Sequence, residues 1–200
     1  MSKCAISHAE SACADLKSAK LVHAEVTSAT SEKSGTVELC KLSVTSRPTA
    51  DSDIRIEVWI PVGAAWNGKF VQLGNGGFAG SIASGRLKMM AASGYAVAGT
   101  DNGHQAMGTS ASWALGHPEK IVDFGWRSLK ETTEVSKALI RAQKGDGPRN
   151  SYFFGCSDGG REALMEAQRF PADFDGIVAG APANYMSRLF GIGTANQQAL

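Results

Sequence analysis

S-Y-F-F-G-C-S-D-G-G, residues Ser151–Gly160, is the stretch that decides the fold of this chain. Its aromatic run Tyr152–Phe154 has the composition of a buried strand, and a helix-like segment follows over 160–170. Between them, Gly155–Gly159 fits the pattern G-x-S-x-G. A strand, a glycine-flanked turn and a helix in this order predict a nucleophile elbow that exposes the hydroxyl of Ser157. The alternative is a glycine-rich strand-to-helix turn without chemistry.

Two sets of backbone N–H donors are predicted to face the oxygen that becomes negative when Ser157 attacks a carbonyl group. The first is the N–H of Asp158, at the positive end of the following helix. The second lies in Gly74–Gly80, which has four glycines directly after a predicted strand and can point free N–H groups at a ligand. In this loop Gly77 is the preferred donor and Gly76 the next. The alternative for the loop is a flexible linker.

Strands and helices alternate along most of the chain, which predicts an α/β fold with a mostly parallel sheet, flanking helices and right-handed crossovers. The sequence pattern predicts strands over 36–46, 53–61, 70–73, 95–99, 152–154 and 176–180, and helices over 86–93, 121–143 and 160–170. Residues 1–34 are predicted to be a polar lead-in with a short helix near 13–19, and residues 181–200 show no clear element.

Composition and charge exclude several classes of partner. The 200 residues are 43% apolar and 20% charged, as in an ordinary globular chain, and the net charge is +1. Such a balance offers no electrostatic reason to bind nucleic acid or an anionic membrane, and no apolar run approaches the ~20 residues of a membrane span. The partner we expect is a small-molecule substrate, and the oligomeric state stays open. Met1–Cys4 does not begin a signal peptide, so the chain is either cytosolic or a mature form with an added start methionine.

The cysteines leave two interpretations open. Cys13 and Cys40 flank a Ser/Thr-rich segment with little core of its own, and a disulfide closing a loop of that length contributes about 3 kcal/mol. The alternative is a set of unrelated free thiols, because pairing cannot be deduced from spacing. Cys156 stands beside Ser157, and Cys4 is assigned to the N-terminal tail.

A general base for Ser157 is missing from the expected place. A nucleophilic serine needs a histidine, and the histidine needs a carboxylate to orient it. In the α/β-hydrolase order both follow the serine, yet no histidine follows Ser157. His104 and Asp101, just after the strand 95–99, border the predicted pocket; they either scaffold a loop or, for His104, supply a base from upstream. The interpretation that we prefer is that the chain ends before the domain does.

Several blocks of sequence resemble, in order, the tannase and feruloyl esterase family. They are W-N-G-K-F at 66–70, G-N-G-G-F-A-G at 74–80, T-D-N-G-H at 100–104, D-F-G at 123–125, G-C-S-D-G-G-R-E-A-L at 155–164, F-P-A-D-F-D-G-I at 170–177 and G-A-P-A at 180–183. The resemblance runs from about Cys13 onward, and the block at 155–164 is highly specific. That family consists of secreted or periplasmic serine esterases with an α/β-hydrolase core and a large inserted lid.

The resemblance assigns roles to particular residues. It implies that Ser157 is the nucleophile, that Asp158 and a glycine of the pair Gly76–Gly77 supply the oxyanion hole, and that Cys13–Cys40 matches the N-terminal disulfide of the family. It also implies that Cys156 pairs with a cysteine beside the catalytic histidine. In such proteins the lid, its structural calcium, the catalytic Asp and His and that cysteine all lie beyond the end of this chain. No cofactor is therefore expected within the chain, and residues 35–200 are the N-terminal part of an α/β-hydrolase catalytic domain.

The function implied by the resemblance is hydrolysis of carboxylic esters of aromatic acids, of the gallic or hydroxycinnamic type, through an acyl-enzyme on Ser157. The implied location is secreted or periplasmic. Two alternatives remain: an inactive truncated fragment that binds partners at most, and a different α/β-hydrolase such as a thioesterase or peptidase.

Overall fold

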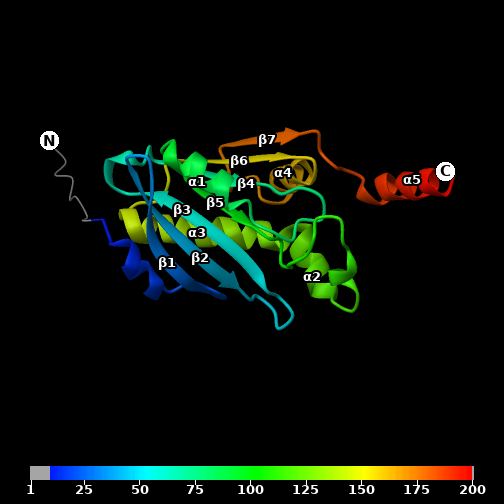
Figure 1. Ribbon diagram of the computed structural model, residues 1–200, viewed down its shortest axis with the longest axis horizontal. Helices are drawn as coiled ribbons and strands as arrows, with labels where there is room; N and C mark the ends of the chain where they lie inside the picture. Colours follow the sequence, from blue (N-terminus) through cyan, green and yellow to red (C-terminus); the bar gives the residue numbers. More distant parts are fainter. Residues whose placement is uncertain (1–9, 200) are drawn as a thin grey trace.

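The computed structural model describes residues 10–199, which form one seven-stranded sheet with helices on both faces (Figure 1). The strand order is β1-β2-β3-β5-β4-β6-β7. The first three strands and β5 pair antiparallel, whereas β5, β4, β6 and β7 are parallel. The strands are β1 (Ala24–Ser34), β2 (Val37–Ser46), β3 (Ile54–Pro61), β4 (Lys69–Leu73), β5 (Ala96–Thr100), β6 (Asn150–Cys156) and β7 (Gly176–Gly180). The carboxyl ends of the four parallel strands share one edge, where open α/β sheets place their sites.

The helices bury two separate apolar clusters against the sheet. The larger cluster joins α3 and α4 to one face through residues such as Leu139 and Ala163, and the smaller joins α1 to the other face through Leu87 and Ala91. The helices are α1 (Ser84–Ala92), α2 (Pro118–Val122), α3 (Ser128–Lys144), α4 (Asp158–Arg169) and α5 (Met186–Gln198), with a π-helical turn η4 (Asp123–Arg127) and short 3₁₀ turns η1 (Cys13–Ser18), η2 (Gly63–Ala65) and η3 (Ser112–Ala114).

The helix predicted over 121–143 is present but interrupted. It begins as α2, with Pro118 in the first turn, where a missing backbone N–H is tolerated. The turn η4 then inserts a wider π-helical segment before α3 continues to Lys144. Gly145, at φ 84°, ends α3 and donates its N–H to the carbonyl of Arg141.

The segment 1–34 contains more structure than a lead-in. The predicted short helix is present as η1, but β1 follows it and pairs antiparallel with β2. Only Val26 of β1 is buried, because β1 is an edge strand of the sheet. A strand of this kind has no alternating apolar pattern to reveal it. Cys4 lies outside the described residues.

A disulfide between Cys13 and Cys40 fastens η1 to β2 (S–S 1.98 Å, Cα–Cα 5.4 Å) and confirms that pairing. Lys17 of η1 adds to the attachment by donating to the carbonyl oxygens of Val26 and Thr27 in β1. Together these contacts hold the N-terminal segment on the antiparallel half of the sheet.

Helix α5 occupies a segment in which no element was predicted. It extends away from the body of the molecule (Figure 1), and none of its residues is buried. Two glycines, Gly191 and Gly193, lie within it, and glycine is a weak helix former. No helix in residues 10–199 is long and apolar enough to cross a lipid bilayer.

Candidate active site

Ser157 sits on the sharp turn between β6 and α4. Its backbone has φ 62° and ψ −118°, a conformation unfavourable for a residue with a side chain. The turn is held on both sides: the N–H of Ser157 donates to the carbonyl of Gly180 at 3.0 Å, and its carbonyl accepts from Gly160 and Ala183 at 3.0 and 2.9 Å. The backbone of residues 155–159 therefore forms the sharp turn that the pattern G-x-S-x-G predicts.

The glycines around the elbow are required by close backbone contacts. A Cβ at Gly155 would overlap the carbonyl of Gly159, and a Cβ at Gly160 would overlap the carbonyl of Gly180. Because no side chain fits at either position, the chain can turn tightly enough to present Ser157 only with glycine there.

The glycine-rich loop after β4 lies directly against the elbow. Gly74 donates its N–H to the carbonyl of Phe154 at 3.0 Å, and Gly159 donates to the carbonyl of Asn75 at 2.8 Å. Gly77 has φ 62°, and a Cβ there would overlap the carbonyl of Gly108. The loop is thus a packed part of the site, with a conformation that needs glycine.

Three N–H groups near Ser157 are free to receive a negative oxygen. Those of Gly76, Gly77 and Asp158 make no hydrogen bond within residues 10–199. Gly77, Asp158 and Ser157 line one cavity, as an oxyanion hole requires.

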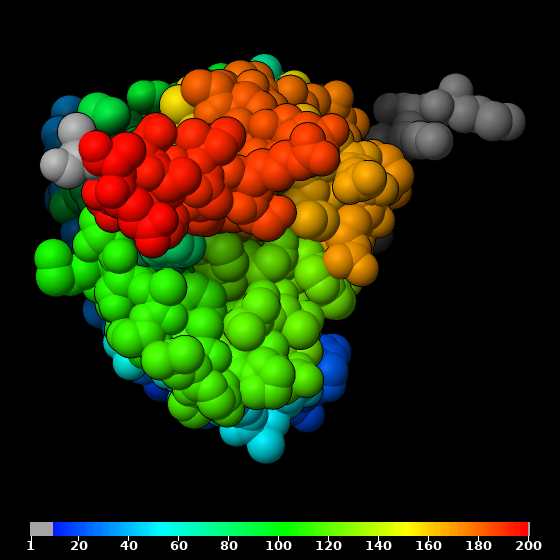
Figure 2. Space-filling view, turned by 90° about the vertical axis from the view of Figure 1, so that its right-hand side faces the viewer, coloured from blue at the N-terminus to red at the C-terminus, as the bar shows by residue number. Residues whose placement is uncertain are grey.

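This cavity has a volume of about 310 Å³ and one strongly apolar side. Gly108, Thr109 and Ala183 complete its polar and small-residue lining. The apolar side is formed by Phe78, Met186, Leu189 and Phe190, and the rings of Phe78 and Phe190 are stacked with centroids 5.0 Å apart. Helix α5 supplies three of these residues; Figure 2, viewed from the side toward which α5 projects, shows it in red above the green middle of the chain. The cavity can accept an apolar or aromatic group next to the serine hydroxyl.

His104 does not contact Ser157. Its Nε2 lies 2.7 Å from the carbonyl oxygen of Phe78 and donates to it, and its ring stacks on Trp113 with centroids 3.9 Å apart. Burial lowers the pKa of His104 below its ordinary value. This geometry fits the loop-scaffolding alternative, because His104 braces the loop that contains Gly77 and Phe78.

Asp101 also makes local backbone contacts. Its Oδ1 accepts from the N–H of Arg55 at 3.0 Å and of Gly103 at 2.9 Å. Burial raises the pKa of Asp101 to about 6. Among the described histidines, none is hydrogen-bonded to Ser157; His117, for example, contacts Asp51 at 2.8 Å.

The carboxyl groups of two buried acidic residues of α4, Asp158 and Glu162, were not assigned a role from the sequence. The carboxylate of Asp158 is held by Arg161, with Nε–Oδ1 at 2.6 Å and Nη2–Oδ2 at 3.3 Å. Arg161 also donates to the carbonyls of Gly125 and Phe124, at 3.1 and 3.2 Å. The first turn of α4 is thereby tied to η4.

Glu162 is fully buried between α4 and the glycine loop. It accepts hydrogen bonds from the backbone N–H of Asn75 at 3.0 Å and from the side chain of Asn102 at 2.5 Å. Burial, with a further contribution from the charge of Asp158, raises the pKa of Glu162 to about 7. The sequence does contain a signal for this buried residue. Glu162 is an acidic residue on the same face of α4 as Ala163, the face that packs on the sheet.

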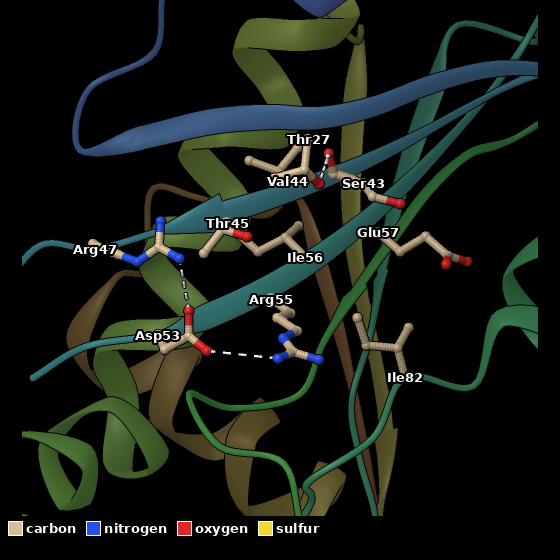
Figure 3. A pocket seen from close by; sticks show the side chains of 10 residues that line it. All are labelled: Thr27, Ser43, Val44, Thr45, Arg47, Asp53, Arg55, Ile56, Glu57 and Ile82. Carbon is tan, nitrogen blue, oxygen red and sulfur yellow. Dashed lines mark hydrogen bonds and ion pairs between the residues drawn. The ribbon is translucent and has the colours of Figure 1, made fainter.

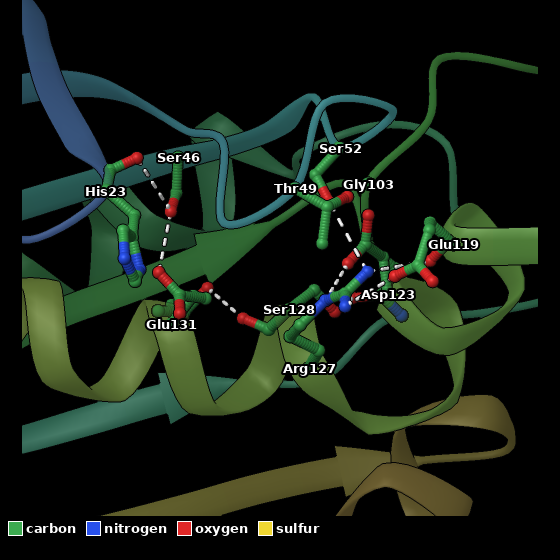
Figure 4. Close-up of polar contacts among 12 residues, drawn as sticks. His23, Ser46, Thr49, Ser52, Gly103, Glu119, Asp123, Arg127, Ser128 and Glu131 are labelled. Atoms are coloured by element: carbon green, nitrogen blue, oxygen red, sulfur yellow. Dashed lines mark hydrogen bonds and ion pairs between the residues drawn. The ribbon is translucent and has the colours of Figure 1, made fainter.

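The D-F-G block at 123–125 has a clear structural role, which Figure 4 shows. Arg127 donates to Asp123 at 2.5 Å, to Glu119 at 2.7 Å and to the hydroxyl of Ser52 at 3.3 Å. These contacts join η4 to α2 and to the loop between β2 and β3. They fix the turn that presents the Phe124 and Gly125 carbonyls to Arg161.

A second cavity of about 490 Å³ lies on the antiparallel half of the sheet, away from Ser157 (Figure 3). Three of its charged residues are paired with one another, since Asp53 contacts Arg47 at 3.2 Å and Arg55 at 3.8 Å, and the fourth, Glu57, is paired with Lys41 at 3.4 Å. It shares no lining residue with the Ser157 cavity.

Cys156 is exposed and free within the described residues, so its predicted pairing stays a prediction. In residues 10–199 no group of three or more His, Cys, Asp or Glu side chains is arranged to hold a metal ion. The calcium implied by the resemblance concerns the lid and also stays a prediction.

Comparison with known proteins identifies the family and the fold. A family model described as "Tannase and feruloyl esterase" matches residues 40–199. An uncharacterized esterase of Xanthomonas campestris is 44% identical over 188 residues, covering 88% of this chain and 32% of that protein. A probable feruloyl esterase B-2 of Aspergillus flavus is 40% identical over 148 residues, covering 74% of this chain and 28% of that protein.

Solved structures agree with the sequence matches. Feruloyl esterase B from Aspergillus oryzae superimposes with a TM-score of 0.79 at 32% identity, covering 86% of this chain and 36% of that one. Tannin acyl hydrolase from Aspergillus niger gives 0.63 at 27% identity, covering 80% and 32%. These esterases are of the α/β-hydrolase type, so the predicted fold class is confirmed. The chain spans about a third of the length of the relatives that it matches.

Proposed function

Because this chain belongs to the tannase and feruloyl esterase family, we propose that it carries the nucleophile and the oxyanion hole of a serine esterase. The observation that carries the proposal is the position of Ser157: it stands on a positive-φ elbow and lines a cavity together with Gly77 and Asp158, whose N–H groups make no hydrogen bond to any described residue. A solvated serine on an ordinary surface turn has neither feature.

In the proposed reaction, Ser157 Oγ attacks the carbonyl carbon of a carboxylic ester. The carbonyl oxygen becomes negative and accepts hydrogen bonds from the N–H groups of Asp158 and Gly77. The tetrahedral intermediate then collapses to an acyl-enzyme and releases the alcohol, and water hydrolyses the acyl-enzyme. One oxyanion donor is typically worth a factor of about 10²–10³ in turnover, or about 3–4 kcal/mol.

The general base in this proposal is a histidine outside residues 10–199, oriented by a carboxylate, as in the Ser-Asp-His order of α/β-hydrolases. The support is that His104 is occupied by the Phe78 carbonyl and His117 by Asp51, and that neither of them nor His23 lines the Ser157 cavity. The described residues thus supply the nucleophile and the hydrogen-bond donors, and their partner histidine comes from elsewhere.

We propose esters of aromatic acids, of the gallic or hydroxycinnamic type, as substrates. The stacked rings of Phe78 and Phe190, with Met186 and Leu189 beside them, offer an apolar wall next to Ser157. Aromatic groups bind well against such surfaces through offset stacking. Relatives named feruloyl esterase and tannin acyl hydrolase act, by their names, on esters of this kind.

The proposed location is outside the reducing cytoplasm, secreted or periplasmic. The disulfide Cys13–Cys40 supports it, because structural disulfides persist mainly in oxidising compartments. Within this proposal Cys156 forms its disulfide with a cysteine outside the described residues, and no cofactor is needed for the chemistry of Ser157.

Labelling of Ser157 tests the proposal most directly. The protein is purified together with the segment that supplies the histidine, treated with a fluorophosphonate and analysed by intact and peptide mass, with Ser157→Ala as the control. We expect an adduct on Ser157 only, and hydrolysis of 4-nitrophenyl ferulate in preference to thioesters or peptides. Turnover in Ser157→Ala equal to that of the wild type would refute the assignment, and preferred cleavage of peptides or thioesters would indicate a different α/β-hydrolase.

A second candidate function follows from the absence of a described histidine in contact with Ser157. The 200 residues alone would then hold an unactivated nucleophile and act at most as a binding module. A folded, monodisperse sample that hydrolyses no ester and forms no adduct would favour this alternative.

A further inference from the structure

We propose that Glu162 is a positioning residue for the oxyanion hole: its buried carboxylate holds the glycine loop against the elbow, so that Gly77 and Asp158 direct their N–H groups at the same oxygen. This inference rests on the proposed function of Ser157. It assigns Glu162 no contact with substrate, and its effect is transmitted through the backbone of Asn75.

Two hydrogen bonds of opposite direction join the loop to α4. The N–H of Asn75 donates to Glu162 Oε2 at 3.0 Å, and the carbonyl of Asn75 accepts from the N–H of Gly159 at 2.8 Å. Both backbone groups of Asn75, its N–H and its carbonyl, are therefore held by α4. Asn75 lies two positions before Gly77. Gly159 lies directly after Asp158, so the same pair of bonds sets the distance between the two proposed donors.

Asn102 extends the contact to the end of β5. Its amide donates to Glu162 Oε1 at 2.5 Å, while its oxygen accepts from the side chain of Asn75 at 3.0 Å and from Ser128 at 3.3 Å. The side chain of Asn75 also donates to the carbonyl of Thr100 at 2.9 Å. Glu162, Asn75 and Asn102 thus form a closed ring that connects the segments after β4 and β5 with α4.

The packing leaves no room for the loop to shift toward α4. A Cβ on Gly74 would lie 2.7 Å from Glu162 Oε2 and 2.7 Å from Gly159 Cα. A Cβ on Gly159 would lie 2.9 Å from the carbonyl oxygen of Asn75. The ring prevents the loop from moving away from α4, and these contacts prevent it from moving closer. The loop therefore has one position relative to the elbow.

The ionised form of Glu162 matches its surroundings. All its partners are N–H donors, including a longer contact from the Asn75 side chain at 3.5 Å. The charged groups that act on it are Asp158, which disfavours ionisation, and Arg161, which favours it. Glu166, one turn further along α4, also disfavours ionisation when it carries a charge. A carboxylate is the acceptor that can satisfy these donors at once.

An exchange of hydrogen-bond polarity tests the ring. In Glu162→Gln the amide nitrogen faces the Asn102 or Asn75 donor, and in Asn102→Asp two carboxylates face each other. In the double variant Glu162→Gln/Asn102→Asp, the new amide donates to the new carboxylate and its oxygen still accepts from Asn75, which restores the ring. Glu166→Gln is the matched control, because Glu166 is also buried on α4 but contacts neither asparagine.

The first readout is independent of activity. Amide hydrogen exchange of Gly159, measured by NMR in the full chain, reports the contact between loop and elbow without touching Glu162. We expect exchange at least about tenfold faster in each single variant, a return to within about threefold of wild type in the double variant, and no change in Glu166→Gln, since the loss of one buried hydrogen bond shifts a local opening equilibrium by about a factor of ten. If Glu162→Gln does not fold, Glu162→Asp, which is too short to reach Asn75, replaces it with the same expectation.

The second readout is the rate at which a fluorophosphonate modifies Ser157 in the protein that includes the histidine-bearing segment, followed over the same variants. We expect a loss of at least about tenfold in the single variants and recovery in the double variant, with kcat rather than KM affected in ester hydrolysis. Unchanged Gly159 exchange in Glu162→Gln and Glu162→Asp, with wild-type labelling, overturns the inference and leaves the proposed function standing. The expected exchange pattern without labelling in any variant, wild type included, supports the positioning role and contradicts the proposed function.

Discussion

A methyl group at Gly77 is predicted to abolish most of the turnover proposed for Ser157. Gly77 has φ 62°, and an added Cβ would overlap the carbonyl of Gly108, so the loop must move and its N–H turns away from the oxyanion. We expect Gly77→Ala to lower kcat by about 100-fold, the typical effect of losing one donor. The measurement is steady-state hydrolysis of an aromatic ester.

Gly76→Ala is the control for that prediction. A Cβ at Gly76 meets no atom within 4 Å, so alanine fits without moving the loop. We expect kcat within about threefold of wild type, since surface substitutions without strain have small effects. Wild-type kcat in both variants would favour the flexible-linker alternative, and equal losses in both would contradict the distinction between Gly77 and Gly76.

Glu166→Gln is predicted to stabilise the protein at high pH. Glu166 is buried, and both its carboxylate oxygens lack a hydrogen-bond partner within residues 10–199. Burial, and next the charge of Asp173, raises the pKa of Glu166 to about 8. Above that pH an unpaired buried charge remains, which the neutral glutamine removes; we expect a gain of at least about 2 kcal/mol in the free energy of unfolding, since a buried group without a partner costs more when it is charged.

The direction of the pH effect follows from proton linkage. A carboxyl group whose pKa is raised in the folded state binds its proton more tightly there than in the unfolded chain. Its stabilising contribution is complete below the ordinary pKa of 4.5 and is lost as the pH rises to about 8. Urea unfolding from about pH 4.5 to about pH 9 should therefore show no gain for Glu166→Gln at the acidic end and the full gain at the alkaline end. A gain independent of pH would contradict the assignment to Glu166 ionisation.

At the scale of elements, the disulfide between η1 and β2 is expected to anchor the N-terminal segment. The double variant Cys13→Ser/Cys40→Ser removes it without leaving a lone thiol, and we expect a loss of about 3 kcal/mol in the free energy of unfolding, as for a loop of similar length. Chemical denaturation measures the loss. In the 200 residues alone, without the proposed partner cysteine of Cys156, Cys156→Ser removes only an exposed thiol and should change stability by less than about 0.5 kcal/mol.

The central elements were predictable because their signals are local. The strands β2 and β3 alternate in sequence, β6 is an aromatic run, and the elbow follows from glycines that its backbone contacts require. The strand β1 was not predicted, because it is an edge strand with one buried residue. Helix α5 was not predicted either, since its contribution is one wall of a cavity and none of its residues is buried.

The polar framework of the site depends on contacts between distant positions. Glu162 meets Asn75 across 87 residues and Asn102 across 60, so no local pattern announces either contact. Ser157, Gly77 and Asp158 could be proposed from motifs because their roles are tied to the turn itself. The position of His104 on the Phe78 carbonyl needed the fold, since the sequence places it only at the correct edge of the sheet.

At the scale of the whole molecule, the face of the sheet around β6 and β7 is expected to cause self-association. Phe154 and Val178 are paired in register and are 41% and 54% exposed. They line an open apolar hollow of about 500 Å³ together with Tyr152 and Ile177, and β7 is an edge strand of the described sheet. Exposed apolar surface beside an open strand edge favours association.

Val178→Lys tests this expectation by placing a charge on the apolar hollow. Sedimentation velocity over a range of concentrations should show a wild-type mass that rises with concentration and a variant that stays closer to monomer. Ile121→Lys is the control, because Ile121 is a similarly exposed apolar residue (51%) on α2. A wild-type chain that remains monomeric at high concentration would contradict the expectation.

The closed ring of Glu162, Asn75 and Asn102 bears on how this site can be engineered. Grafting only the G-x-S-x-G stretch onto another scaffold would transfer the serine and leave behind the contacts that hold the glycine loop against it. The smallest portable unit is the elbow with α4, the loop after β4 and the first residues after β5, moved together. In a library of variants, substitutions at the positions of the ring should be encoded jointly. A compatible pair such as Glu162→Gln with Asn102→Asp can otherwise be reached only through a single variant that is itself unfavourable.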